Sequence, residues 1–210
     1  PTDMIDRYGA DTVRLFCLFA APPERDFDWS DTGIEGSSRF LNRIWRLFVE
    51  LRPHLEATAA CSSTETCAAV PAARELRLRE HATVRKVGED IGNRYQFNTA
   101  IAAVMELVNS LYLAKDELTA SPEGREALSS AMATVLTLLY PITPHMCEEL
   151  WQDLGHSDSL AEERWPQWQE SALKRDMITM VLQVNGKLRG KIEVPAEASR
   201  EEAEKLALGD

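Results

Sequence analysis

Two helix-start signals built on proline constrain the fold of this chain more than any other feature. Ser121-Pro122-Glu123 combines a capping residue, a proline at the first helical position and an acid in the first turn. Thr143-Pro144 repeats the start just after Tyr140-Pro141 has ended the preceding helix, and Gly155 is suited to close the second one. Helices with connections this short favour an antiparallel bundle.

Further helices are predicted upstream, over 3–19, over 30–51 with Ser30 as cap, over 74–93, and from a cap at Asn98. Leaving out the helix over 3–19, which belongs to the junction, the bundle is predicted to contain four or five amphipathic helices. Between the helices over 30–51 and 74–93, residues 57–73 are rich in Ala, Ser, Thr and Cys and show no periodicity, which predicts a surface linker.

The helix predicted over 30–51 carries apolar side chains on one face at about 100° per residue, which predicts a buried stripe. The stripe consists of Ile34, Leu41, Ile44, Trp45, Phe48 and Leu51. Because Trp45 belongs to it, we expect core packing for this indole, and its truncation should destabilise the fold by about 3–5 kcal/mol.

After Pro166 the pattern changes to strands. Residues 177–184 and 187–194 flank Asn185-Gly186, a dipeptide typical of a tight hairpin turn, and Ser199 predicts the cap of a following helix. The expected fold is therefore mainly α, an antiparallel helix bundle followed by a truncated small α+β domain with a β-hairpin. We place a connecting helix and junction at 1–33, the bundle at 34–165 and the incomplete domain at 166–210.

Composition limits the functional classes. The formal net charge of −11 argues against a nucleic-acid partner unless basic residues gather locally. No apolar run reaches the ~20 residues of a membrane span, and four cysteines without a C-x-x-C pair indicate reduced thiols in a cytoplasmic protein rather than disulfides or zinc. A start at Pro1, with no signal-peptide pattern, is expected of an excised fragment.

Several stretches together resemble class I aminoacyl-tRNA synthetases, and nearly the whole chain takes part in the resemblance. The stretches are YGADTVR at 8–14, PPERDFDW at 22–29, RFLNRIW at 39–45, FNTAIA at 97–102, PITPH at 141–145 and VNGKLRGK at 184–191. All but the last are shared with the valyl, isoleucyl and methionyl members. The last resembles the first hairpin of the C-terminal domain of bacterial-type leucyl enzymes, which tips the resemblance to that type.

The resemblance implies an anticodon-binding bundle that positions leucine tRNA for ATP- and Mg-dependent attachment of leucine by a full-length ligase. Neither ATP-handling signature, His-Ile-Gly-His or Lys-Met-Ser-Lys-Ser, occurs here. We therefore expect an inactive fragment with no cofactor or metal of its own, a monomer without membrane or DNA partners. The alternatives are the same module of a valyl, isoleucyl or methionyl enzyme, or a non-enzymatic helical interaction scaffold.

Three basic clusters are candidates for tRNA contact. The first lies opposite the apolar stripe, where a solvated face with Glu50 as partner of Arg46 is the alternative. The second is interrupted by acids, so an ion-pair-laced helix surface is equally compatible. The third alternates along one strand, so its side chains should share one face, as phosphate ligands or as protection of a sheet edge. The clusters are Arg39, Arg43 and Arg46; His81, Arg85, Lys86 and Arg94; and Lys187, Arg189 and Lys191.

His145 with Glu148 and Glu149 contains two residue types that bind metals, but the spacing of a metalloprotease helix is missing. A surface helix is the better interpretation of these residues. No metal site and no catalytic residue is predicted for this chain.

Overall fold

The computed structural model of the chain describes residues 2–26, 29–174, 177–184, 187–195, 198, 202 and 204–206. Its helices and strands are α1 (Thr2–Tyr8), α2 (Ala10–Ala20), α3 (Asp31–Leu51), η1 (Arg52–His54), η2 (Glu65–Ala69), α4 (Pro71–Arg94), α5 (Phe97–Leu118), α6 (Pro122–Leu139), α7 (Pro144–Asp153), η3 (Leu160–Glu162), α8 (Glu170–Leu173), β1 (Met177–Val184) and β2 (Lys187–Pro195).

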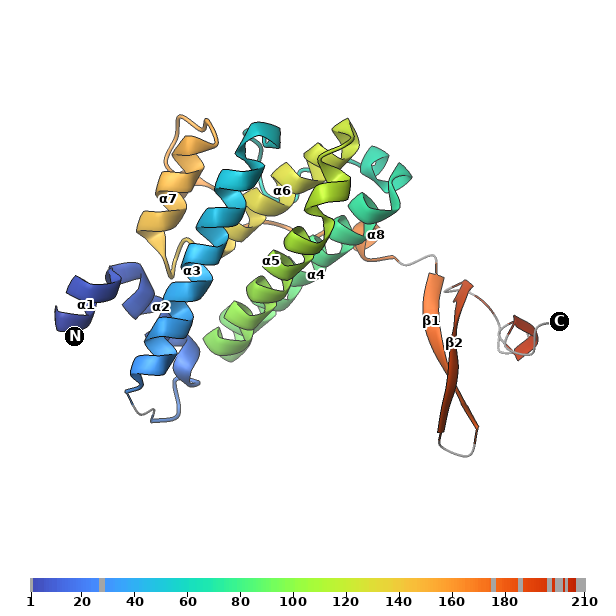
Figure 1. Ribbon diagram of the computed structural model, residues 1–210, viewed down its shortest axis with the longest axis horizontal. Coiled ribbons are helices and arrows are strands. Elements are labelled where there is room, and N and C mark those ends of the chain that lie inside the picture. The colour runs from blue at the N-terminus through green and yellow to red at the C-terminus, as the bar shows by residue number, and fades with distance from the viewer. Residues whose placement is uncertain are drawn as a thin grey trace. The chain divides into compact units, whose positions relative to one another are not determined.

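The contacts divide the chain into a helical unit, residues 1–172, and a hairpin unit, residues 173–210. In the helical unit α4 packs along α5, α6 packs on both, and α2 joins α3 and α5 while α7 lies on α6 (Figure 1). Buried side chains from α2, α3, α4, α5, α6 and α7 form one core. The predicted antiparallel bundle is confirmed.

The expected helix starts are confirmed by their capping bonds. The Gly124 amide donates to Ser121 Oγ at 3.0 Å, and the Gly33 amide donates to Ser30 Oγ at 3.3 Å. Each bond satisfies one of the amides that a helix leaves unpaired in its first turn. Gly155 has a φ of 106°, as expected of the residue that closes a helix.

Two predicted helix boundaries were wrong. The helix expected over 3–19 is two helices, because Gly9 adopts a φ of 83° and breaks the helix between Tyr8 and Ala10. Asn98 is not a cap, because α5 begins at Phe97 and Gln96 occupies the cap position. The preceding α4 ends at Arg94, and the next residue, Tyr95, turns the chain with a left-handed φ of 53°.

The prediction that Trp45 belongs to the buried stripe was also wrong. Its side chain is 42 % exposed, whereas Leu47 is fully buried. Trp45 therefore lies at the edge of the buried face of α3, which packs against α2 and α5. The expected loss of 3–5 kcal/mol on truncation therefore does not apply to this residue.

Residues 57–73 are not the surface linker that their composition predicts. Cys61, Ser63 and Cys67 in this segment are buried. The segment is tied to α6, since Ser130 Oγ accepts the amides of residues 62 and 63 at 2.9 and 3.1 Å. It is also tied to α4, whose Glu80 accepts the Cys61 amide at 3.0 Å.

Glu80 is fully buried, and only one of its two oxygens has hydrogen-bond partners among the described residues. Thr134 and Ser130 donate to Oε1 at 2.6 and 2.8 Å. Burial raises the pKa of Glu80, against the lowering effect of these bonds and of the Arg77 charge. A carboxyl whose pKa is raised by folding stabilises the folded state fully at a pH below its unfolded-state pKa. This stabilisation is lost as pH rises through the folded-state pKa.

Glu80→Gln, which cannot ionise, should therefore gain stability relative to the parent as pH rises above the ordinary carboxyl value of 4.5. The gain should not exceed about 1.4 kcal/mol per pH unit. Urea unfolding between pH 4 and 8 measures it, with Glu75→Gln as control, because Glu75 is an exposed acid on the same helix. Parallel profiles for Glu80→Gln and the parent would contradict a desolvated carboxyl.

The hairpin unit contains an antiparallel pair, β1 with β2, as predicted. Asn185-Gly186 and Ser199, the expected turn and cap, lie outside the described residues. The bundle extends further than the predicted boundary at 165, because Pro166 and Ala172 are buried in the helical unit. The connecting helix and junction predicted at 1–33 group with the helical unit.

Among the described residues, α5 is long and apolar enough to cross a membrane by length and composition alone. In the structure its stripe, including Ile101, Leu107 and Leu111, is buried against the neighbouring helices of the bundle. The apolar character of α5 is therefore explained by its place in the core.

Candidate nucleic-acid interface

The first cluster forms an exposed arginine face on α3. Arg39, Arg43 and Arg46 are all exposed, as their helical phase predicts. Arg39 lies 3.7 Å from the Glu35 carboxylate, and both side chains are largely solvated, so this ion pair is weak. Glu50, the alternative partner proposed for Arg46, instead pairs with Lys115 of α5.

Arg43 is held in place by α5. Its Nη1 donates to Asn109 Oδ1 at 2.5 Å, and its guanidinium carbon lies 4.4 Å from the centroid of the Tyr112 ring. The Tyr112 hydroxyl in turn donates to the Arg43 carbonyl at 2.8 Å. A cation fixed in this way loses less rotamer entropy when it binds an anion.

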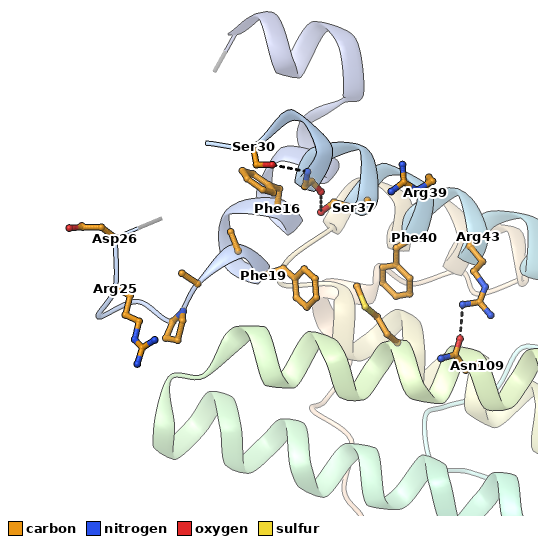
Figure 2. Close-up of a pocket in the computed structure, with 16 residues that line it drawn as sticks. Phe16, Phe19, Arg25, Asp26, Ser30, Ser37, Arg39, Phe40, Arg43 and Asn109 are labelled. Carbon is orange, nitrogen blue, oxygen red and sulfur yellow. Dashed lines mark hydrogen bonds between the residues drawn. The ribbon is translucent and has the colours of Figure 1, made fainter. Parts of the chain in front are cut away.

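A recess of about 970 Å³ opens beside the arginine face, between α2, α3 and α5 (Figure 2). Its lining includes the rings of Phe16, Phe19 and Phe40, with Arg39 and Arg43 along the α3 side. Arg25, on the loop after α2, adds a further cation. The recess therefore places three arginines and one acid, Asp26, beside the exposed ring of Phe19, while Phe16 and Phe40 are buried. Positive charge beside an exposed ring is a combination suited to nucleotides.

In the second cluster, His81 cannot be a tRNA contact, which corrects the prediction. The imidazole is 0 % exposed, and its Nδ1 accepts the Gln169 amide at 3.1 Å. Burial lowers the pKa of His81 to about 4, with the Arg77 charge acting in the same direction, so the ring is neutral at pH 7. Its role is to hold the segment before α8 against α4.

Lys86 and Arg94 flank a single buried carboxylate, Asp90, at 2.8 and 3.6 Å. Burial acts to raise the pKa of Asp90, but hydrogen bonds from Lys86 and Thr99 and the two positive charges hold it below its ordinary value. Lys86 and Arg94 therefore form the ion-pair-laced helix surface that was the alternative to tRNA contact for this cluster. Arg85 remains exposed, with its guanidinium 5.6 Å from the Trp168 ring centroid.

The third cluster lies on β2, where Arg189 is exposed. Gln183 pairs with Leu188 and Leu182 pairs with Gly190, so Arg189 is an extra residue between two paired positions. The expectation of one shared face for Lys187, Arg189 and Lys191 assumed an unbroken alternation. The register shift lies within this stretch of β2. The side chains of Lys187 and Lys191 lie outside the part of the chain whose side chains the structure describes, so their shared face stays a prediction.

Sequence reasoning missed the residues that complete the α3 face. Asn109 and Tyr112 are separated from Arg43 by 66 and 69 positions, and Arg25 lies in an irregular loop. The i,i+3 spacing of Asn109 and Tyr112 places both on one face of α5. Which helix that face meets could not be told from one sequence.

Comparison with known proteins supports the interpretation as a tRNA-binding region. A sequence profile described as "Anticodon-binding domain of tRNA ligase" matches residues 73–205. The whole chain is 69 % identical to a leucine–tRNA ligase of Nitratidesulfovibrio vulgaris strain DP4 and 58 % identical to one of Lawsonia intracellularis. It spans about a quarter, 25 %, of the length of each of these curated relatives.

A solved structure has the same fold. It is the ternary complex of Agrobacterium radiobacter K84 agnB2 LeuRS with tRNA and LeuAMS, which matches all of this chain with a TM-score of 0.86 and 28 % identity, over 26 % of its own length. With this match and the profile covering most of the chain, the chain belongs to the family of anticodon-binding domains of tRNA ligases.

Proposed function

We propose that this chain is the tRNA-binding region of a leucyl-tRNA synthetase and that it positions leucine tRNA for attachment of leucine by the full-length enzyme. The observation that carries the proposal is the α3 face, where Arg43 is fixed by α5 beside an aromatic recess. Phosphate contacts from such a face orient an RNA without reading its sequence. The names of the relatives support leucine over valine, isoleucine or methionine.

The chemistry of the reaction belongs to other parts of the ligase. The chain contains neither ATP-handling signature, and its described residues form no cluster of metal-binding side chains. We propose that ATP and Mg²⁺ bind in the catalytic part of the full-length enzyme. The proposal places the enzyme in the cytoplasm as a monomer, with RNA rather than DNA or a membrane as its partner.

The proposal predicts that the chain binds leucine tRNA and that this binding weakens with salt. The logarithm of the association constant should fall linearly with the logarithm of salt concentration, by about 0.7–0.9 per phosphate bound. Fluorescence anisotropy with labelled leucine tRNA and a non-cognate tRNA measures both affinity and slope. Circular dichroism on the same sample verifies that the helices are folded.

The same sample should show no leucine-dependent ATP–pyrophosphate exchange, since it lacks both signatures. Measurable exchange would contradict its assignment as a non-catalytic region. Binding of neither tRNA by a folded sample would instead favour the helical interaction scaffold, for which the net charge of −11 is suitable.

A further inference from the structure

The corner between α6 and α7 lacks the local groups that usually complete a helix end. Thr143 occupies the cap position of α7, but its side chain makes no capping bond and contacts Leu139 and Cys147 instead. Proline at the first position of α7 has no amide, so the Met146 amide is one of the donors that still needs an acceptor. The carbonyls of Pro141 and Ile142 need donors on the other side of the corner.

Asp11 of α2 supplies the missing cap from a distance of 135 residues in sequence. Its Oδ2 accepts the Met146 amide at 2.7 Å, and its Oδ1 lies 2.8 Å from His145 Nδ1. Met146 is the third residue of α7, the position whose amide a capping side chain commonly binds. A carboxylate at this end of a helix is also favoured by the helix dipole.

Arg14, one turn further along α2, binds the other side of the corner. Its Nε donates to the Ile142 carbonyl at 2.8 Å and its Nη2 donates to the Pro141 carbonyl at 2.9 Å. Asp11 and Arg14 are spaced i,i+3, so one face of α2 presents an acid to the start of α7 and a base to the carbonyls after α6. We call this pair the α2 clamp.

The α2 clamp fixes the orientation of α2 in the bundle, whereas hydrophobic contacts attach α2 to it. Val13, Leu15 and Phe16 are buried and already hold α2 in the bundle. Hydrophobic contacts are not directional, whereas the three clamp bonds to main-chain atoms of the corner define the angle of α2. The break at Gly9 separates α1 from α2, so α2 is the first helix that the bundle holds firmly.

We propose that Asp11 and Arg14 are positioning residues, which set the angle between the bundle and the part of the ligase that precedes it. The inference rests on the proposed function, in which this chain is part of a longer leucyl-tRNA synthetase; the chain spans 25 % of the length of its curated relatives. A tRNA held by the bundle reaches a distant active site only at the correct angle. Small misplacements of a bound substrate can cost about 10²-fold in rate.

Asp11→Asn and Arg14→Gln in the full-length ligase test the proposal. Each should lower the kcat of leucine transfer to tRNA about tenfold or more, with little change in leucine-dependent ATP–pyrophosphate exchange or in the Kd for tRNA. The double variant should lose no more than the worse single variant, because both residues act on one element. Arg7→Gln is the matched control, since Arg7 contacts its neighbour Tyr8 and should leave kcat unchanged.

Hydrogen exchange of α2 amides provides a second readout and should be faster in both variants. An unchanged kcat would overturn the positioning role. A kcat that falls together with the thermal midpoint and with tRNA affinity would also overturn it, because the residues would then be merely structural. Failure of the proposed function is distinguishable, since the unmodified full-length protein would then neither activate leucine nor charge tRNA.

Discussion

Replacing Trp151 by alanine is expected to lower the free energy of unfolding of the helical unit by about 3–5 kcal/mol. The indole is 1 % exposed and is among the largest fully buried side chains. Its ring stacks on His156 with centroids 3.5 Å apart, and its Nε1 donates to the Asp158 carbonyl at 3.2 Å. Truncation removes this packing and leaves a cavity where α7 meets the residues that follow it.

Trp45→Ala is the matched control, because the residue type is the same and the side chain is half-exposed. We expect a loss below about 1 kcal/mol. Urea unfolding followed by circular dichroism at 222 nm compares the two variants without relying on tryptophan fluorescence. Equal losses would mean that the burial of the two indoles is not as the structure has it.

Exchanging Arg39, Arg43 and Arg46 together for glutamine should raise the KM for tRNA about ten- to a hundredfold in the full-length enzyme. A ten- to hundredfold change corresponds to about 1.4–2.8 kcal/mol in total. That is about the contribution of one hydrogen bond to a charged group, and we expect no more from the three together because exposed charges are screened by solvent. The salt slope should fall by about 0.7–0.9 for each phosphate that an arginine no longer neutralises. Leucine activation measured without tRNA should stay unchanged. The thermal midpoint should fall only slightly, because all three side chains are exposed and only the Arg43 contacts with Asn109 and Tyr112 are lost.

The control for this triple variant is Arg79→Gln, an exposed arginine on α4 that pairs with Glu75 at 2.8 Å. Its tRNA affinity should match the parent. If the triple variant also matches the parent in affinity and in salt slope, α3 is not part of the RNA-binding surface. Arg85 and Arg189, both exposed, would then be the better candidates.

The parts of the fold that depend on residues close together in the sequence could be predicted from it. The capping bonds at Ser30 and Ser121 connect residues three apart, so the residue types alone indicate them. The same applies to the strand pattern after Pro166. Helical periodicity did not predict the exposure of Trp45. A residue at the edge of an apolar stripe is buried only if a neighbouring helix covers it, and periodicity does not show which helix that is.

The candidate site was predictable only in part, for the same reason. The phase of α3 correctly placed three arginines on an exposed face, but the partners of Arg43 come from α5. His81 and Arg85 are four residues apart in one basic cluster, yet the first is buried under the Gln169 amide and the second is exposed. Charge composition does not distinguish these cases, since burial of His81 depends on a segment 88 residues away.

The attachment of residues 56–63 to α6 also imposes an order on the folding of this chain. The amides of Glu56 and Cys61 bind Ser129 and Thr134, which lie 73 positions later in each case. During synthesis the segment is therefore complete long before its partners exist, and its main chain must stay hydrated until α6 is made. Closing a loop of this length is an entropic step that local helix formation does not require. The segment should order late and remain open to proteases in the nascent chain.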